Sequence, residues 1–70
     1  MTFRLTDPDG RELGCWSVPR LDALFRYFVA CHELPVSIWQ RLDAQMRLAP
    51  TARAWDVCGY TLRRIDAAKP

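Results

Sequence analysis

The sequence lacks any uninterrupted apolar run approaching the roughly 20 residues that a membrane-spanning helix requires. Its opening residues, Met1-Thr2-Phe3-Arg4, also lack the apolar core of a secretory signal peptide. These two absences lead us to expect a cytoplasmic protein with no membrane partner. The 70 residues have room for one domain. A domain of this size buries only about 60% of its unfolded surface, so a spacious internal active site is not expected.

Cysteine is also scarce. Cys15, Cys31 and Cys58 are odd in number and contain no C-x-x-C spacing, which indicates a reducing compartment rather than a disulfide framework. A zinc site would have to recruit His32, yet this residue is adjacent to Cys31, and neighbouring side chains on a helix diverge by ~100°. We therefore predict no metal site and expect the three cysteines to pack as small buried hydrophobic residues.

The sequence contains few residues and motifs that are typical of catalytic sites. The chain has one histidine and contains no G-x-S-x-G nucleophile motif, no glycine-rich phosphate loop and no H-E-x-x-H metal motif. The adjacency of Cys31 and His32 in the sequence does not supply the geometry of a nucleophile and its base. The sequence thus predicts a non-enzymatic protein that uses no cofactor.

Lysine is nearly absent, whereas arginine is abundant. The chain contains nine arginines and one lysine but only eight acidic residues, which gives a formal net charge of +2. This net positive charge is too small for a protein that wraps a polyanion, and its sign is wrong for an acidic mimic of DNA. Arginine recognises phosphate and carboxylate groups in a bidentate manner, but a GC-rich genome also favours arginine codons. The scattered positions of the arginines favour the second explanation.

The first quarter of the chain is typical of a β-hairpin. Polar and apolar residues alternate over Thr2–Thr6, as in a half-buried strand. Asp7-Pro8-Asp9-Gly10 supplies turn chemistry, and a second strand is predicted from Arg11 to Ser17. On that second strand we place Leu13 and Cys15 on one face, and Glu12, Gly14 and Trp16 on the other.

The hydrophobic period then changes to that of a helix. From about Pro19, apolar residues recur at helical spacing and predict a helix that runs to Cys31 or His32. Leu34-Pro35 interrupts it, because the residue before a proline is pushed out of the helical region. A second helix is predicted over about Val36 to Arg47, opened either by a Ser37–Gln40 capping box or by Pro35.

The C-terminal part returns to strand-forming residues. Ala52–Val57 and Tyr60–Ile65 are rich in β-branched and aromatic types, and a glycine separates them. The pattern Asp56-x-x-Gly59 repeats Asp7-x-x-Gly10, as though both hairpins used the same four-residue turn. A single bent strand over 52–65 is the competing interpretation. The last residues, 67–70, are predicted to form a frayed tail.

These segments predict an α+β fold in residues 1–66. One small antiparallel sheet carries both helices on one face, in the order β-β-α-α-β-β or β-β-α-α-β. Strand and helix residues share one core, to which Trp39 also belongs. We expect the strands to contribute Phe3, Leu5, Leu13, Cys15, Trp55, Val57 and Leu62, and the helices to contribute Leu21, Leu24, Phe25, Phe28, Ile38, Leu42 and Met46.

Aromatic residues and arginine exceed what so small a core requires. Trp16 lies on the predicted strand face opposite to Leu13, and Tyr27 lies off the apolar stripe of its helix, so both are expected at the surface. Trp, Tyr and Arg dominate the energetics of protein interfaces. A homodimer seam is a second use of such a surface. We predict protein binding through Trp16, Tyr27, Arg26, Arg4, Arg63 and Arg64.

Nucleic-acid binding is the alternative. The sheet face away from the helices would carry Arg4, Trp16, Arg63 and Ile65, and this mixture of guanidinium groups with an aromatic ring suits single-stranded nucleic acid. However, the chain lacks the aromatic-rich pattern of an RNA-recognition sheet, and its net charge is small. Protein binding is therefore the preferred interpretation.

The predicted fold begins with a hairpin and ends with a strand segment, Trp55-Asp56-Val57-Cys58-Gly59-Tyr60-Thr61-Leu62. In size, architecture and style it resembles several anti-CRISPR proteins, which are small accessory proteins of bacteriophages and other mobile elements. The resemblance implies an inhibitor in the cytoplasm of a bacterial host cell that occludes a CRISPR effector complex by surface complementarity. Because the chain lacks the strong negative charge of the nucleic-acid-mimicking members, a protein surface of the effector is the expected target.

Overall fold

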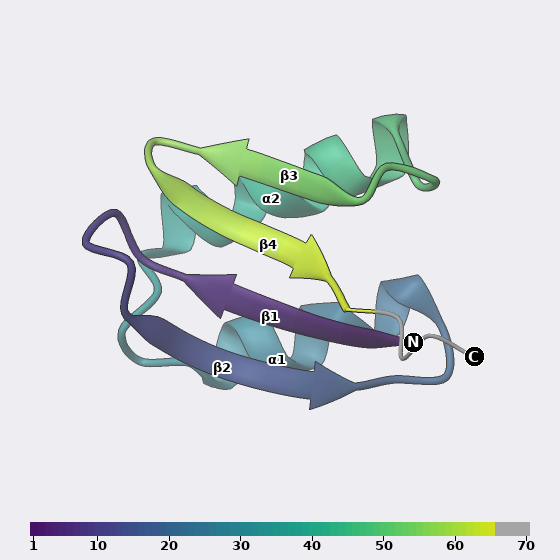
Figure 1. Cartoon of the computed structure of the whole chain (residues 1–70), viewed down its shortest axis with the longest axis horizontal. Coiled ribbons are helices and arrows are strands. Elements are labelled where there is room, and N and C mark those ends of the chain that lie inside the picture. The colour runs from purple at the N-terminus through teal and green to yellow at the C-terminus, as the bar shows by residue number, and fades with distance from the viewer. Residues whose placement is uncertain (66–70) are drawn as a thin grey trace.

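The computed structural model describes residues 1–65 as a four-stranded antiparallel sheet with two helices on one side (Figure 1). The predicted α+β class is confirmed, in the order β-β-α-α-β-β, with a C-terminal hairpin in place of a single bent strand. The predicted tail, 67–70, and the domain limit at residue 66 lie outside the described residues. The elements are β1 (Thr2–Thr6), β2 (Glu12–Ser17), the 3₁₀ turn η1 (Leu21–Ala23), α1 (Leu24–Ala30), α2 (Val36–Leu48), β3 (Ala54–Val57) and β4 (Tyr60–Arg64).

The first and last strands meet at the centre of the sheet. The strand order is β2-β1-β4-β3, so each hairpin forms one half of the sheet and β1 pairs with β4 between them. Across this central pairing Leu5 lies opposite Leu62, and Phe3 lies opposite Arg64. Helix α1 lies behind β1 and β2, and α2 lies behind β4 and β3 (Figure 1). No described element covers the other face of the sheet, which we call the uncovered face.

The β1–β2 turn is held by the side chain of Asp7. Its carboxylate oxygen Oδ1 accepts hydrogen bonds from the backbone N–H of Asp9 (3.0 Å) and of Arg11 (2.9 Å). Gly10 has a φ of 86°, which a residue with a Cβ rarely adopts. The residue types that predicted this turn are therefore the ones that form it.

The β3–β4 turn is built differently. Its two central residues, Cys58 and Gly59, have φ values of 50° and 88°, as in the type I′ turn that joins closely paired strands. Val57 and Tyr60 pair directly on either side of it. Asp56 lies within β3, so the prediction that both hairpins use the same four-residue turn is wrong.

A β-bulge at Leu13 changes the register within the first hairpin. Near the turn Thr6 pairs with Glu12, but the next residue of β1, Leu5, pairs with Gly14. One extra residue is thus accommodated in β2. Because side chains alternate along a strand, an extra residue reverses the faces of all the residues that follow it.

This reversal places Trp16 on the helix-facing side of the sheet. Trp16 lies opposite the buried Phe3, whereas Cys15 lies opposite the exposed Arg4 and is itself exposed on the uncovered face. The predicted faces of Trp16 and Cys15 are therefore wrong. The prediction followed the register that holds at the turn and did not include the bulge.

The helical layer begins later than the sequence predicts. Arg20 is still extended, the 3₁₀ turn follows it, and regular α-helix begins only at Leu24. Helix α1 ends at Ala30, and the link 31–35 leads into α2. Pro35 is the N-cap residue of α2, where no side chain forms a capping hydrogen bond. Of the two predicted openings, the structure shows the proline, and the Ser37–Gln40 capping box is not formed.

The core lies between the sheet and the helices, and most of its predicted members are buried. Val18 and Leu34 are buried in addition to those predicted, and Leu13, Leu21 and Trp39 are only partly buried. The prediction for Phe25 is wrong, since its side chain is 42% exposed. The buried apolar residues are Phe3, Leu5, Val18, Leu24, Phe28, Leu34, Ile38, Leu42, Met46, Trp55, Val57 and Leu62.

The cysteines depart from the prediction that all three are buried. Cys15 and Cys58 are exposed and Cys31 is half-buried. Within residues 1–65, no three residues of the types that ligate metals lie close enough together to hold an ion. Neither helix of this described part has the length and hydropathy needed to cross a membrane.

Candidate partner-binding surfaces

The six predicted contact residues do not lie on one surface. Trp16 of β2 and Tyr27 of α1 stack on each other, and Arg26 is exposed on the same helix. Arg4, Arg63 and Arg64 lie on the central strands β1 and β4. The two groups are described separately, because they present different chemistry.

Helix α1 is apolar on nearly all sides. Only two of its seven residues, Leu24 and Phe28, are buried. Phe25, Tyr27 and Val29 leave 42%, 39% and 55% of their surface exposed. A helix at a protein surface ordinarily carries polar residues on its outer side, and a helix that is apolar all round is normally enclosed. We call the exposed residues Phe25, Arg26, Tyr27 and Val29 the α1 surface.

Trp16 supports the α1 surface from the neighbouring strand. Its indole stacks on the ring of Tyr27, with centroids 5.5 Å apart and planes 23° apart, and meets Phe28 edge-on at 6.2 Å. The indole also lies across Gly14, where a Cβ atom would be 2.6 Å from Cη2 of Trp16. A glycine two residues before a tryptophan in a strand is the sequence signal for this packing, because a ring can lie flat only over a residue that has no side chain.

The same surface continues onto α2. Phe25 meets Trp39 edge-to-face, with ring centroids 5.0 Å apart and planes 86° apart. Val36, one turn before Trp39, is 60% exposed. The sequence places Trp39 in the core, but its ring is only partly buried and instead links the two helices beside the α1 surface.

The α1 surface carries a single charge. Arg26 is the only charged residue of α1, and within residues 1–65 it forms no ion pair. The surface is thus apolar with one free guanidinium group. Its chemical complement is an apolar patch with a carboxylate at its border.

Arg4 and Arg63 lie side by side on the uncovered face. They are direct partners in the β1–β4 ladder, and both are exposed. Arg4 also forms an ion pair with Glu12, with 2.8 Å between Nε and Oε1. Trp16 was expected on this face and lies on the other one, so the aromatic ring that would stack on a nucleic-acid base is not there.

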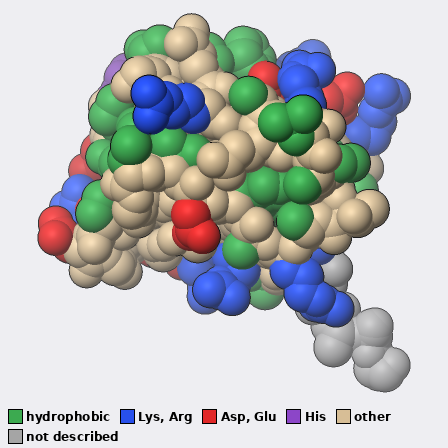
Figure 2. All heavy atoms as spheres, turned by 90° about the horizontal axis from the view of Figure 1, so that it is seen from above, with side chains coloured by type: hydrophobic (Ala, Val, Ile, Leu, Met, Phe, Trp, Pro, Cys, Tyr) green, Lys and Arg blue, Asp and Glu red, His purple; other side chains and the backbone are tan. Residues whose placement is uncertain are grey.

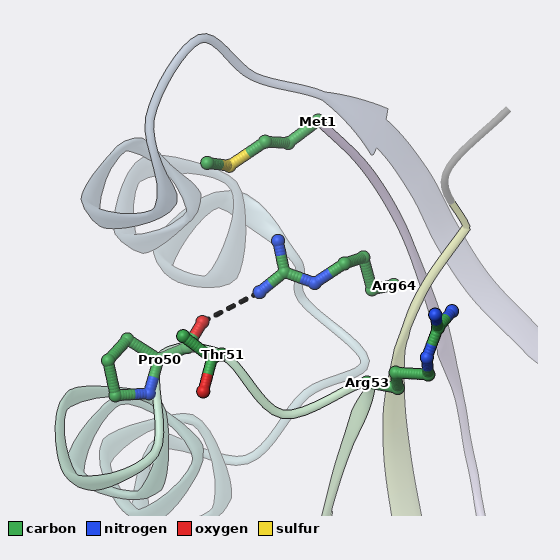
Figure 3. A pocket seen from close by; sticks show the side chains of 5 residues that line it. All are labelled: Met1, Pro50, Thr51, Arg53 and Arg64. Atoms are coloured by element: carbon green, nitrogen blue, oxygen red, sulfur yellow. Dashed lines mark hydrogen bonds between the residues drawn. The ribbon is translucent and has the colours of Figure 1, made fainter. Parts of the chain in front are cut away.

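Arg64 has a structural task that the sequence does not reveal. Its Nη2 donates to the carbonyl oxygen of Pro50 at 2.7 Å, and its Nε donates to that of Ala52 at 3.4 Å. Its guanidinium carbon lies 5.3 Å from the ring centre of Phe3 and 5.7 Å from that of Trp55. Arg64 therefore fastens the loop between α2 and β3 to the end of the sheet (Figure 3).

Comparison with known proteins does not assign a function, so a function has to be inferred from the geometry of these surfaces. No family model matches the chain, and no curated protein and no solved structure matches it.

Proposed function

We propose that this chain is a small non-enzymatic binding protein that inhibits a host complex, and that the α1 surface contacts the target. The observation that carries the proposal is the exposure of Phe25, Tyr27 and Val29 on a helix with a single charged residue. Leaving such a surface in water forgoes stabilisation that a partner would supply by covering it. Exposed aromatic residues next to an arginine are also typical of the residues that dominate protein–protein binding energy.

The surface suits a protein rather than a nucleic acid. Tyr27 is held by its stack on Trp16, so little side-chain freedom is lost when a partner covers it. The nucleic-acid alternative relied on an aromatic ring beside the arginines of the uncovered face, and that ring lies on the opposite side of the sheet. The remaining arginines lack the stacking platform on which single strands bind.

The target class follows from the resemblance to anti-CRISPR proteins. We take the partner to be a protein subunit of a CRISPR effector complex that presents an apolar patch with a carboxylate at its border. Covering that patch would block DNA binding or nuclease recruitment by occlusion.

The proposal is tested by binding of the purified protein to purified CRISPR effector complexes, together with an assay of target-DNA cleavage. Tyr27→Ser, Val29→Ser and Arg26→Glu are each expected to weaken binding about tenfold or more, since hot-spot residues contribute about 2 kcal/mol. Leu48→Ser and Arg20→Glu are the matched controls. They alter an 85% exposed leucine and an exposed arginine outside the α1 surface, and no loss of affinity is expected.

Circular dichroism of each variant verifies that the fold is retained. Val29→Ser is informative even where Tyr27→Ser loosens the stack on Trp16, because Val29 is 55% exposed. Failure to bind or inhibit any effector type would refute the target class. Inhibition that survives all three α1-surface substitutions would refute the surface.

A further inference from the structure

Strand β2 lies at one edge of the sheet, where β1 is its single neighbour among the described strands. Met1 and Val18 exchange both of their backbone hydrogen bonds, at 3.1 and 2.8 Å. In an antiparallel ladder, such pairs alternate with pairs whose backbone groups point away from each other. Ser17 and Cys15 belong to the second kind, so their N–H and C=O groups point outwards from the sheet.

The backbone of Thr2 confirms this alternation. Thr2 is the partner of Ser17 across the first hairpin, yet its carbonyl oxygen accepts a hydrogen bond from Ile65 on the other side, at 2.7 Å. The backbone groups of Thr2 therefore face β4, and those of Ser17 face away from the sheet. No described strand lies on that outer side of β2 to pair with them.

This edge lacks most of the features by which sheets avoid pairing with other chains. Edge strands are commonly very short, or they carry charged residues or proline. β2 has six residues, and the last four, Gly14 to Ser17, include neither a charge nor a proline. The bulge at Leu13 interrupts only the start of the strand. The other edge strand, β3, has four residues including Asp56, and Figure 2, seen from the β3 side, shows acidic and basic side chains there.

We propose that the β2 edge pairs with the β2 edge of a second copy of this chain. The two strands run antiparallel and join the two four-stranded sheets into one. Cys15 of each copy lies opposite Ser17 of the other, because only this register pairs both outward-facing residues of one strand with both of the other. Each of these pairs exchanges its backbone hydrogen bonds, and Trp16 lies at the two-fold axis.

The side chains of β2 fit this register. The indole of Trp16 lies over Gly14 of its own strand, so the two indoles of the dimer lean in opposite directions, away from the axis. On the uncovered face the small side chains of Cys15 and Ser17 meet, and both are exposed. Residues 14–18 are all uncharged, so the pairing brings no like charges opposite each other.

The dimer leaves most of the α1 surface open. Helix α1 lies behind β1 and β2 (Figure 1), so both copies of α1 lie on the same side of the joined sheet. Tyr27 stacks on Trp16 of β2, whereas Phe25 meets Trp39 of α2, so the two rings lie on opposite flanks of α1. Val29 lies one turn after Phe25 on the same flank. Tyr27 thus borders the seam, and the dimer presents Phe25 and Val29 twice. The pairing of β2 does not depend on the proposed function.

Self-association of the full chain is measured by sedimentation equilibrium from micromolar to millimolar concentration, where the mass should rise towards twice the 8.1 kDa of one chain. Ser17→Pro should weaken the dimer about tenfold or more, because two intermolecular backbone hydrogen bonds are lost. Ala54→Pro is the matched control. Arg64 donates to the carbonyl oxygen of Arg53, so the backbone of Ala54 faces outwards at the β3 edge, and its substitution should leave the dimer unchanged. A mass that stays at that of one chain, or equal weakening by both prolines, would overturn the pairing.

Ser17→Cys tests the register and remains informative if Ser17→Pro does not fold. It places a thiol opposite Cys15 of the second copy, at the ~5.5 Å between Cα atoms of a hydrogen-bonded pair, which a disulfide spans. Oxidation with diamide should therefore link Ser17→Cys into covalent dimers at least about tenfold faster than the unsubstituted chain, and adding Cys15→Ser should remove this gain. Equally fast linkage of the unsubstituted chain would overturn the register.

The dimer and the proposed function fail in different ways. Self-association that is lost in Val29→Ser but kept in Ser17→Pro would place the contact on α1 and overturn the pairing of β2. A chain that stays monomeric and still inhibits an effector would overturn the dimer alone. A dimer that binds no effector would refute the proposed function and leave the pairing of β2 standing.

Discussion

Replacing Gly14 with alanine tests the packing of Trp16 most directly. In the structure a Cβ atom at position 14 would lie 2.6 Å from Cη2 of Trp16 and closer still to Cζ2. The indole would have to leave its place above the strand, and its contacts with Tyr27 and Phe28 would be lost or distorted. Had Trp16 been on the uncovered face, its ring would not be held between Gly14 and α1 in this way.

The expected cost follows from three contributions. Overpacking a well-packed site costs about 1–3 kcal/mol, and a disrupted aromatic pair costs about 0.5–1.5 kcal/mol. Replacing glycine by alanine in a strand recovers roughly 0.5–1 kcal/mol through chain entropy. We expect Gly14→Ala to lower the free energy of unfolding by about 1–3 kcal/mol, which in a domain of this size lowers Tm by roughly 5–20 °C.

Thermal and urea unfolding, followed by far-ultraviolet circular dichroism, measure this cost. The matched control is a double-mutant cycle with Trp16→Ala. Once the indole is removed, Gly14→Ala should be neutral or stabilising, because the three atoms nearest to the new methyl group all belong to the indole of Trp16. An unchanged or raised Tm in the single variant Gly14→Ala would refute the placement of Trp16 over Gly14, and with it the bulge at Leu13.

Two further predictions concern the C-terminal hairpin. Cys58→Asn is expected to raise the free energy of unfolding by about 0.5–1 kcal/mol, because asparagine tolerates the φ of 50° better than cysteine does; a lower Tm in thermal unfolding would contradict this. Arg64→Lys should lower the free energy of unfolding by about 1–2 kcal/mol, because an ammonium group cannot bond two carbonyl oxygens while lying across two rings. Arg63→Lys on the uncovered face is the control, with an expected change below about 0.5 kcal/mol in urea unfolding.

The elements of the fold were predictable because their signals are local. Asp7 and Gly10 form the turn that their chemistry indicates, and α2 occupies nearly the predicted range. The apolar spacing of Leu24 and Phe28 identified the buried side of α1. In each case the interactions that decide the conformation join residues only a few positions apart.

The candidate surfaces were only partly predictable. Tyr27 and Arg26 were expected at the surface and lie there, but Phe25 was assigned to the core. Only Leu24 and Phe28 of the seven residues of α1 are buried. The ring of Phe25 instead packs against Trp39 of α2 and stays 42% exposed.

The strands, the helices, their order and most of the core follow from the sequence alone, because hydrophobic period and turn chemistry act over short distances. The face of Trp16 and the role of Arg64 depend instead on contacts between distant parts of the chain. A single bulge at Leu13 reverses the second half of β2, and its position depends on pairing with β1 rather than on the residues of β2 alone. The bonds of Arg64 to Pro50 and Ala52 likewise form only when the loop after α2 is brought to the end of β4.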